Sequence, residues 1–132
     1  MTKKKLPLIF HYIKNDFDPP APVLEISLSS PVSQGEAIKI PALLDSGADI
    51  TVIPQDIVYK LQLKYVDRLP TSGYDGSSKD SCVYSVKIAI ENLGNYIIKV
   101  IALERDNVLV GRDMLNKWSI LLKGREEIFE IF

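Results

Sequence analysis

The chain has 132 residues, and its 46% hydrophobic content is enough to build one core. The 16 Lys and Arg residues nearly cancel the 17 Asp and Glu residues, which disfavours binding to nucleic acid or an anionic membrane surface. Cys82 is the single cysteine, so an internal disulfide is excluded and a reducing compartment is favoured. We therefore expect one domain over residues 1–132 in a cytoplasmic protein.

The first apolar stretch, residues 6–13, is interrupted by Pro7, His11 and Tyr12. It is too short to span a bilayer, and no small-residue cleavage site follows it. We therefore predict neither a signal peptide nor a membrane segment, and we interpret His11 as a strand or surface residue. With one His and one Cys, the chain lacks clustered metal ligands, so we expect no metal and no cofactor.

The dominant pattern along the chain is alternation of apolar and polar residues, which indicates strands with one buried face. Pro41 restricts its strand to an edge or a bulge. Residues 91–95 have turn chemistry and predict an antiparallel hairpin between the strands that flank them. The predicted strands cover residues 24–28, 38–44, 51–53, 84–90, 96–103 and 128–132.

Only two segments have helical spacing. The first begins at Pro54 and places Ile57, Val58 and Leu61 three and four residues apart. The second covers residues 112–118 after a glycine turn. Many short strands with two minor helices predict a mainly β fold, a small closed β-barrel or folded sheet.

One acidic residue, Asp45, stands where an apolar strand breaks at a glycine. A carboxylate beside two leucines is costly unless it is paired or hydrogen-bonded, so this position favours a catalytic acid. Gly47 permits a tight turn, and the Ser46 hydroxyl can hold a neighbouring strand. The alternative is an ordinary Asp-Ser-Gly turn, but the apolar run that continues through Val52 is not typical of a solvated turn.

Here the sequence resembles the retropepsin-like aspartic proteases. Their first signature is a hydrophobic residue, Asp, Thr or Ser, Gly, Ala and further hydrophobic residues, and residues 44–52 match it. Their second signature is a hydrophobic run that ends in Gly, Arg and a short helix, and residues 108–116 match it in the same order. The resemblance covers residues 23–118 and implies a closed β-barrel of the retropepsin type with one or two short helices.

The resemblance implies a role for each matched residue. Asp45 would be the catalytic acid of an aspartic endopeptidase, Ser46 would brace a dimer, and Gly47 would keep the turn. Ala48 and Asp49 would contact the backbone of a peptide or protein substrate. Asp49 and Arg112 would form a buried or half-buried ion pair, and Asp113 would cap the helix that follows.

This chemistry requires two carboxylates, one ionised to activate water and one protonated to polarise the scissile carbonyl. The chain contains one suitable triplet, so the second Asp45 would come from a symmetric partner. We therefore expect a homodimer, an inactive monomer and an acidic to mildly acidic optimum. Residues 128–132 are too apolar to remain in solvent, and they would pair either with a partner's terminal strands or as an internal edge strand.

Residues 71–81 combine Gly73 and Gly76 with four serines and two aspartates, which is typical of a mobile polar hairpin. In the resembling family such a flap closes over an extended peptide, which makes Tyr74, Asp75 and Gly76 candidate substrate contacts. The tip is more polar than is usual there, so a surface loop without function is the alternative.

Because the chain begins at Met1, we expect a cellular enzyme rather than a piece of a viral polyprotein.

Two other functions stay open at this point. The first is a catalytically weak module that keeps the retropepsin fold for dimerisation or peptide binding, and the polar flap is the feature that motivates it. The second is a small β-barrel ligand binder unrelated to proteases, which would be monomeric at micromolar concentration. Substitution of Asp45 distinguishes the protease from the binding module.

Overall fold

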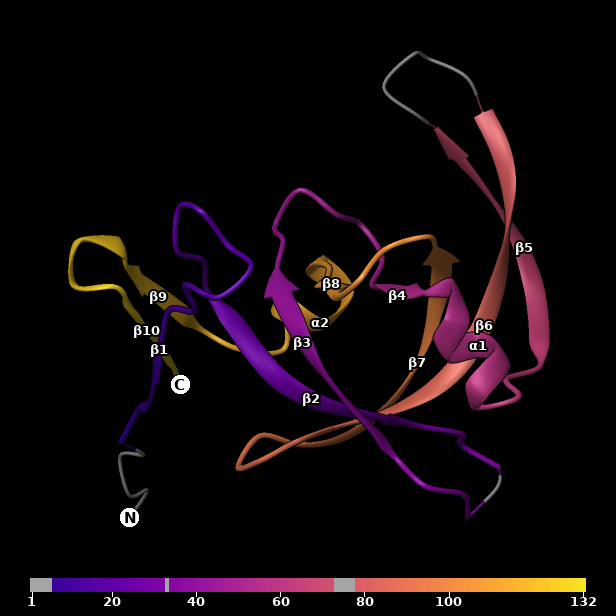
Figure 1. The fold of residues 1–132 in the computed structure, drawn as a ribbon, viewed down its shortest axis with the longest axis horizontal. Helices are drawn as coiled ribbons and strands as arrows, with labels where there is room; N and C mark the ends of the chain where they lie inside the picture. The colour runs from indigo at the N-terminus through magenta and orange to yellow at the C-terminus, as the bar shows by residue number, and fades with distance from the viewer. Residues whose placement is uncertain (1–5, 33, 73–77) are drawn as a thin grey trace.

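The computed structural model describes residues 6–32, 34–72 and 78–132 of the chain. Within these ranges the fold is mainly β, with two short α-helices and one 3-10 turn (Figure 1). The elements in chain order are β1 (Leu8–His11), β2 (Val23–Ser29), β3 (Ile38–Leu44), β4 (Val52–Pro54), α1 (Gln55–Lys60), β5 (Tyr65–Ser72), β6 (Ser78–Ile90), β7 (Gly94–Leu103), β8 (Val108–Val110), α2 (Arg112–Leu115), β9 (Ile120–Lys123), η1 (Gly124–Glu126) and β10 (Ile128–Ile131).

The larger sheet closes on itself. Its strand order is β2-β3-β8-β4-β7-β6-β5, and β6 also pairs with β2. The strands from β2 to β6 therefore form a closed ring, while β5 hydrogen-bonds to β6 outside it. The predicted closed barrel is confirmed.

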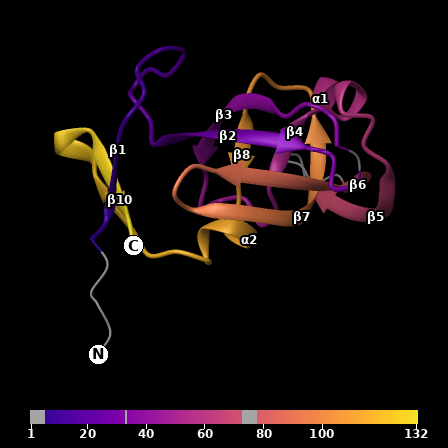
Figure 2. The ribbon, with the colours of Figure 1, turned by 90° about the horizontal axis from the view of Figure 1, so that it is seen from below.

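The inward positions of the barrel strands build the core, as the alternation predicts. Leu24, Ile26 and Leu28 of β2 are each at most 1% exposed, whereas Glu25 between them is exposed. Helix α1 adds Ile57 and Val58 to the same cluster. Its start directly after Pro54 agrees with the predicted helix boundary. Figure 2 shows the barrel from a second direction.

Two strand pairs are parallel, which the alternation did not predict. β3 runs parallel to β8, with Leu44 opposite Val110, and β4 runs parallel to β7. These pairs place the ends of β3 and β8 side by side at one end of the barrel. Both loops that carry the two family-like signatures begin there.

Pro41 lies in an interior strand, so the predicted edge or bulge is wrong for β3 as a whole. The Leu44 N–H donates to the Pro22 carbonyl at 3.1 Å, toward β2. Alternation along the strand then points the Pro41 nitrogen to the β8 side. β8 pairing begins only at Ala42, so the missing N–H of Pro41 disrupts no ladder bond.

The hairpin predicted around residues 91–95 is confirmed, because β6 and β7 pair antiparallel from Val83↔Ile101 to Ile90↔Gly94. β5 and β6 form a second antiparallel hairpin, which pairs as far as Ser72↔Ser78. In Figure 1 this hairpin rises above the rest of the barrel.

A separate three-stranded sheet, in the order β1-β10-β9, joins the two ends of the chain. β10 is its middle strand, so neither predicted arrangement of residues 128–132 is correct: both sides of β10 are paired within the chain. Phe129 is fully buried and stacks on Phe10 with ring centroids 5.0 Å apart. Figure 2 shows this sheet standing beside the barrel.

Helix α2 is shorter than predicted and ends at Leu115, with Asn116 as its C-cap. Trp118 follows in a turn and packs edge-on against Tyr96, with ring centroids 6.0 Å apart. Leu115 and Trp118 nevertheless both pack against the core. Neither helix of the described ranges is long and apolar enough to cross a membrane.

Candidate active site

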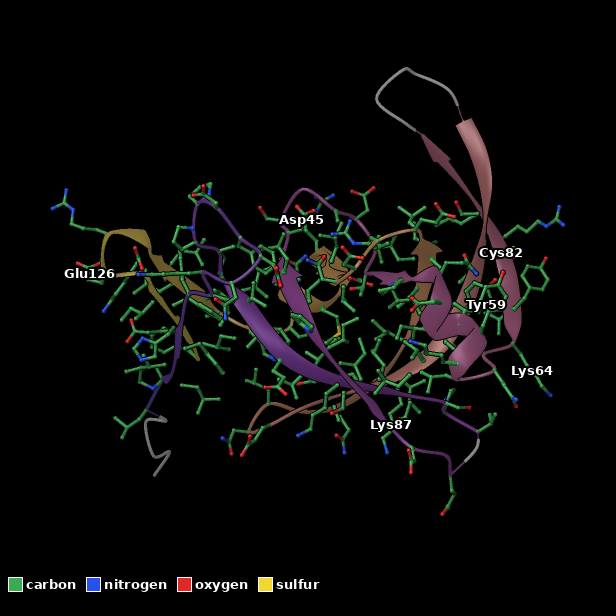
Figure 3. All side chains as sticks on the ribbon, viewed as in Figure 1. Asp45, Tyr59, Lys64, Cys82, Lys87 and Glu126 are labelled. Atoms are coloured by element: carbon green, nitrogen blue, oxygen red, sulfur yellow. The ribbon has the colours of Figure 1, made fainter. Side chains whose placement is uncertain are left out.

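Asp45 follows directly after β3, at the end of the parallel pair with β8. Its N–H donates to the Val110 carbonyl at 2.9 Å, which extends that pairing by one residue. The Gly47 N–H donates to Asp45 Oδ1 at 2.9 Å, so the turn itself holds the carboxylate. The side chain is partly exposed and lies at the barrel end from which the β5–β6 hairpin rises (Figure 3).

The bond from Gly47 to the Asp45 side chain is the Asx-turn geometry that an ordinary Asp-Ser-Gly turn also adopts. Local geometry therefore does not separate the two interpretations of this triplet. The difference comes from the long-range contacts of the loop, because residues 45–51 are bound on one side by β8 and by the loop that follows it.

Gly111 brings the second loop into backbone contact with the first. A Cβ atom added at Gly111 would lie 2.7 Å from the Ile50 carbonyl carbon and 3.0 Å from the Ala48 oxygen. The Arg112 N–H donates to that same Ala48 oxygen at 2.8 Å. Only glycine permits this approach, so the two loops are held together as one unit.

Arg112 holds two further residues of the first loop through its side chain. Its guanidinium donates to the Ser46 carbonyl at 2.7 Å and forms an ion pair with Asp49. The predicted pairing of Asp49 with Arg112 is confirmed, but the predicted burial is wrong in the single chain. The Asp49 side chain is 86% exposed and that of Arg112 is 45% exposed.

Thr51 and Asp113 form a contact that the sequence analysis missed. The Thr51 hydroxyl donates to Asp113 Oδ1 at 2.7 Å, and its N–H donates to Oδ2 at 3.1 Å. The Thr51 oxygen in turn accepts the Gly111 N–H at 3.1 Å. Asp113 makes no capping hydrogen bond to α2, so its predicted role as a cap is wrong. The available signal was Thr51 itself, a polar residue at a fully buried position in an apolar run.

The remaining predicted site residues divide into two groups. Ser46 is exposed, and its hydroxyl bonds to no other group of the described chain. Tyr74, Asp75 and Gly76 lie outside the described residues.

A small apolar cluster lies next to the site and was not predicted. Val52, Val83 and Ile101 are buried together, apart from the main core, and Ile50 and Leu109 pack on them while partly exposed. Ile50 and Val52 flank Thr51, so the cluster connects the loop that follows Asp45 with β6 of the hairpin.

The family model described as gag-polyprotein putative aspartyl protease matches residues 34–117, which include both loops. The chain belongs to this family. A search of curated proteins gave no match. Retropepsin-like aspartic proteases are also found among the structural neighbours of the chain.

Three solved structures illustrate the shared fold. A retropepsin-like aspartic protease from Rickettsia conorii is 15% identical, with a TM-score of 0.64, and the match covers 99% of this chain and 96% of that one. Simian foamy virus protease is 21% identical, with a TM-score of 0.55 over 72% of this chain and 92% of its own. EIAV protease, solved with the inhibitor HBY-793, is 17% identical, with a TM-score of 0.55 over 74% and 86%.

Proposed function

We propose that the chain is one subunit of a homodimeric aspartic endopeptidase in which Asp45 of each copy supplies one carboxylate. The observation that carries the proposal is the way Asp45 is held. Its N–H bonds to Val110 of β8, and its Oδ1 accepts the Gly47 N–H. Arg112 bonds to the backbone of the same loop, which Gly111 approaches closely. A carboxylate needs this precision to act at a scissile bond, whereas a surface turn does not.

The chemistry follows from two carboxylates that share one proton, because two like charges side by side do not both ionise. The ionised carboxylate accepts a proton from water as the water oxygen attacks the peptide carbon. The protonated carboxylate donates to the carbonyl oxygen. When the tetrahedral intermediate collapses, the C–N bond breaks and the leaving nitrogen takes the proton that the first carboxylate accepted from water. A hydroxyl of the intermediate returns its proton to the second carboxylate as the carboxylic acid product forms. Activity should therefore be highest at acidic to mildly acidic pH.

Substrate would lie as an extended strand between the Asp45 loop and the β5–β6 hairpin. Asp49 is held by Arg112 yet mostly exposed, so a carboxylate oxygen stays available for substrate N–H groups. We assign Ala48, Asp49, Tyr74, Asp75 and Gly76 to substrate contacts and Ser46 to contact with the second copy. Pairing of an extended peptide with a hairpin is strand addition.

The test is Asp45→Asn in the purified protein, assayed on a peptide library from pH 3 to pH 8, a range of about five units around the expected optimum. We expect cleavage by the parent protein, sensitivity to an aspartic-protease inhibitor, and loss of about 100-fold or more in the variant. Asp56→Asn is the matched control, because Asp56 is exposed on α1 and pairs with Lys60 on the same helix. Unchanged cleavage by Asp45→Asn would refute the assignment, and no cleavage by either protein would favour the binding module.

A further inference from the structure

The first part of β3 lacks a neighbouring strand on the side that faces β8. β8 pairs only with residues 42–44, so no strand of the described chain pairs with residues 38–41 on that side. The bond from the Leu44 N–H to the Pro22 carbonyl fixes the alternation of backbone groups along β3. The N–H and C=O of Lys39 therefore point into the open side, and the sheet has a gap beside them.

A groove of about 570 Å³ lies at this gap. Residues 38–40 of β3 line it, together with residues of α1 and residues 104–106 of the loop between β7 and β8. Because Val108 pairs with Ala42, that loop stands where the open part of β3 ends. α1 lies on the opposite side of the barrel from the terminal sheet (Figure 1), and no residue of the loop 45–51 lines the groove.

Two cations that line the groove already have partners. Lys60 forms an ion pair with Asp56, one turn earlier on α1, at 3.2 Å. The Arg105 guanidinium donates to the Asn107 carbonyl at 2.7 Å and to the Asn107 side-chain oxygen at 2.6 Å. Neither cation is paired with an acid of the β7–β8 loop.

The charges without a partner have a fixed order along the groove. Lys39 lies on the open part of β3, and Glu104 and Asp106 lie on the loop at its end. All three residues are exposed, and none of them forms an ion pair within the described chain. One positive charge is therefore followed by two negative charges in the direction of β3. A free lysine on an open edge also keeps two copies of the same edge apart.

We propose that this groove binds an extended peptide segment of another protein, added as a strand to β3 and carrying an acidic residue two positions from a basic one. The acidic residue would face Lys39 across the strand pair. The basic residue would reach Glu104 and Asp106, because every second residue of a strand lies on the same face. The peptide backbone would bond to the N–H and C=O of Lys39. Binding at this groove does not require cleavage at Asp45, so the inference does not rest on the proposed function.

The outer edge of β5 is also free and fits such a peptide less well. Its register with β6 shifts between Tyr65 and Asp67, which interrupts regular pairing. The Asp67 carboxylate already accepts the Arg68 N–H at 2.7 Å. β3, in contrast, pairs with β2 without a shift from residue 38 to residue 43, so its open part is a regular edge.

The test measures the binding of labelled peptides to the full chain by fluorescence anisotropy. The probes are Thr-Val-Glu-Val-Lys-Val-Thr and its reverse, Thr-Val-Lys-Val-Glu-Val-Thr, which represent the two strand directions. We expect one direction to bind about fivefold or more tightly than a peptide in which Ser replaces Glu and Lys. N-methylation of every second peptide nitrogen tests the strand pairing. One methylated set should lower the affinity by about fivefold, and the other should leave it unchanged, because alternate N–H groups face β3.

Substitutions in the protein test the two ends of the groove separately. Lys39→Glu should weaken binding of the better probe by about fivefold, and a peptide with Lys in place of Glu should restore it. Glu104→Gln combined with Asp106→Asn should weaken the same probe, and high salt should weaken its binding to the parent protein. Glu91→Gln is the matched control, because Glu91 is exposed in the turn between β6 and β7. All of these positions are exposed, so the fold should tolerate the changes.

Two further measurements separate this groove from the proposed active site. The better probe should bind Asp45→Asn as tightly as the parent protein, and an aspartic-protease inhibitor should not displace it. Displacement by the inhibitor would place the peptide at the active site and overturn the proposal. Absence of binding up to millimolar peptide, equal affinity for the Ser peptide, equal effects of the two methylated sets, or full binding by Lys39→Glu would overturn it as well. Failure of the cleavage assay would not affect any of these outcomes.

Discussion

At the scale of single residues, the site depends on two positions that carry no reacting group. Gly111 lets one loop reach the backbone of the other, and Asp113 accepts both hydrogen bonds that the buried Thr51 can donate. Asp45 is positioned through the loop that these contacts support. Substitutions at either position therefore test the support separately from the chemistry.

Gly111→Ala should lower both stability and activity. The added Cβ would lie 2.7 Å from the Ile50 carbonyl carbon, and backbone atoms must move to admit it. We expect the free energy of unfolding to fall by about 1–3 kcal/mol, measured by urea denaturation, with a larger relative loss in kcat. Gly124→Ala is the control, because the nearest atom to its added Cβ is the Tyr12 hydroxyl at 3.9 Å. Equal effects of the two substitutions would contradict the close-approach argument.

Substitutions of Asp113 should give a graded loss of stability. Asp113→Ala leaves the buried N–H and O–H of Thr51 without an acceptor, which costs about 1–3 kcal/mol of unfolding free energy. Asp113→Asn should lose less, because its amide oxygen can still accept the Thr51 N–H. Thermal melts followed by circular dichroism should rank the parent protein first, Asn second and Ala last. A ranking in which Ala equals the parent would show that the contact does not stabilise the fold.

At the scale of elements, the terminal sheet links the start of the chain to its end. Phe129 of β10 is fully buried between the sheet and the barrel core, and it stacks on Phe10 of β1. β9 and β10 follow α2, which begins at the second loop of the site. The terminal sheet and the site are therefore connected through one short segment.

Phe129→Ala should destabilise the protein by about 3–5 kcal/mol, because it leaves a cavity in the core and removes the ring stack. Phe132→Ala is the control, because Phe132 follows β10 directly and is 58% exposed. This substitution should change the unfolding free energy by less than about 0.5 kcal/mol. Both values come from urea denaturation at one protein concentration. Similar losses for the two variants would mean that the terminal sheet does not share the core.

At the scale of the whole molecule, the proposed function gives each chain one catalytic carboxylate, so the proposed enzyme is complete only as a pair. The exposed surfaces around the site fit this interpretation. Asp49 and Ser46 are both exposed in the single chain. Activity should then depend on the square of the active-chain fraction rather than on the fraction itself.

Mixing parent protein with Asp45→Asn in equal amounts tests this directly. If subunits exchange freely and both carboxylates are required, about one quarter of the dimers keep two Asp45 side chains, so activity falls to about one quarter of the unmixed protein. Independent sites would leave about one half. The measurement is the initial rate of peptide cleavage at constant total protein, after long enough incubation for exchange.

Local sequence patterns determined a large part of this protein. Alternation identified β2, β3 and β6, because a two-residue period follows from strand geometry alone. Turn chemistry at residues 91–95 identified the β6–β7 hairpin. Residues 44–52 and 108–116 resemble the two signatures of the retropepsin-like aspartic proteases in order and spacing, and the family model that matches residues 34–117 confirms the family. Pairing of Asp49 with Arg112 followed from the same motifs.

Only the tertiary structure decided which strands meet. Periodicity tells which face of a strand is buried but not which partner it takes, so the parallel β3–β8 pair and the closing β2–β6 pair were not predicted. Thr51 and Asp113 are 62 residues apart, and their contact exists because that pairing aligns the two loops. The same reason placed β10 in the middle of the terminal sheet and left β9 at its edge, since partners distant in sequence are selected by closure of the whole chain.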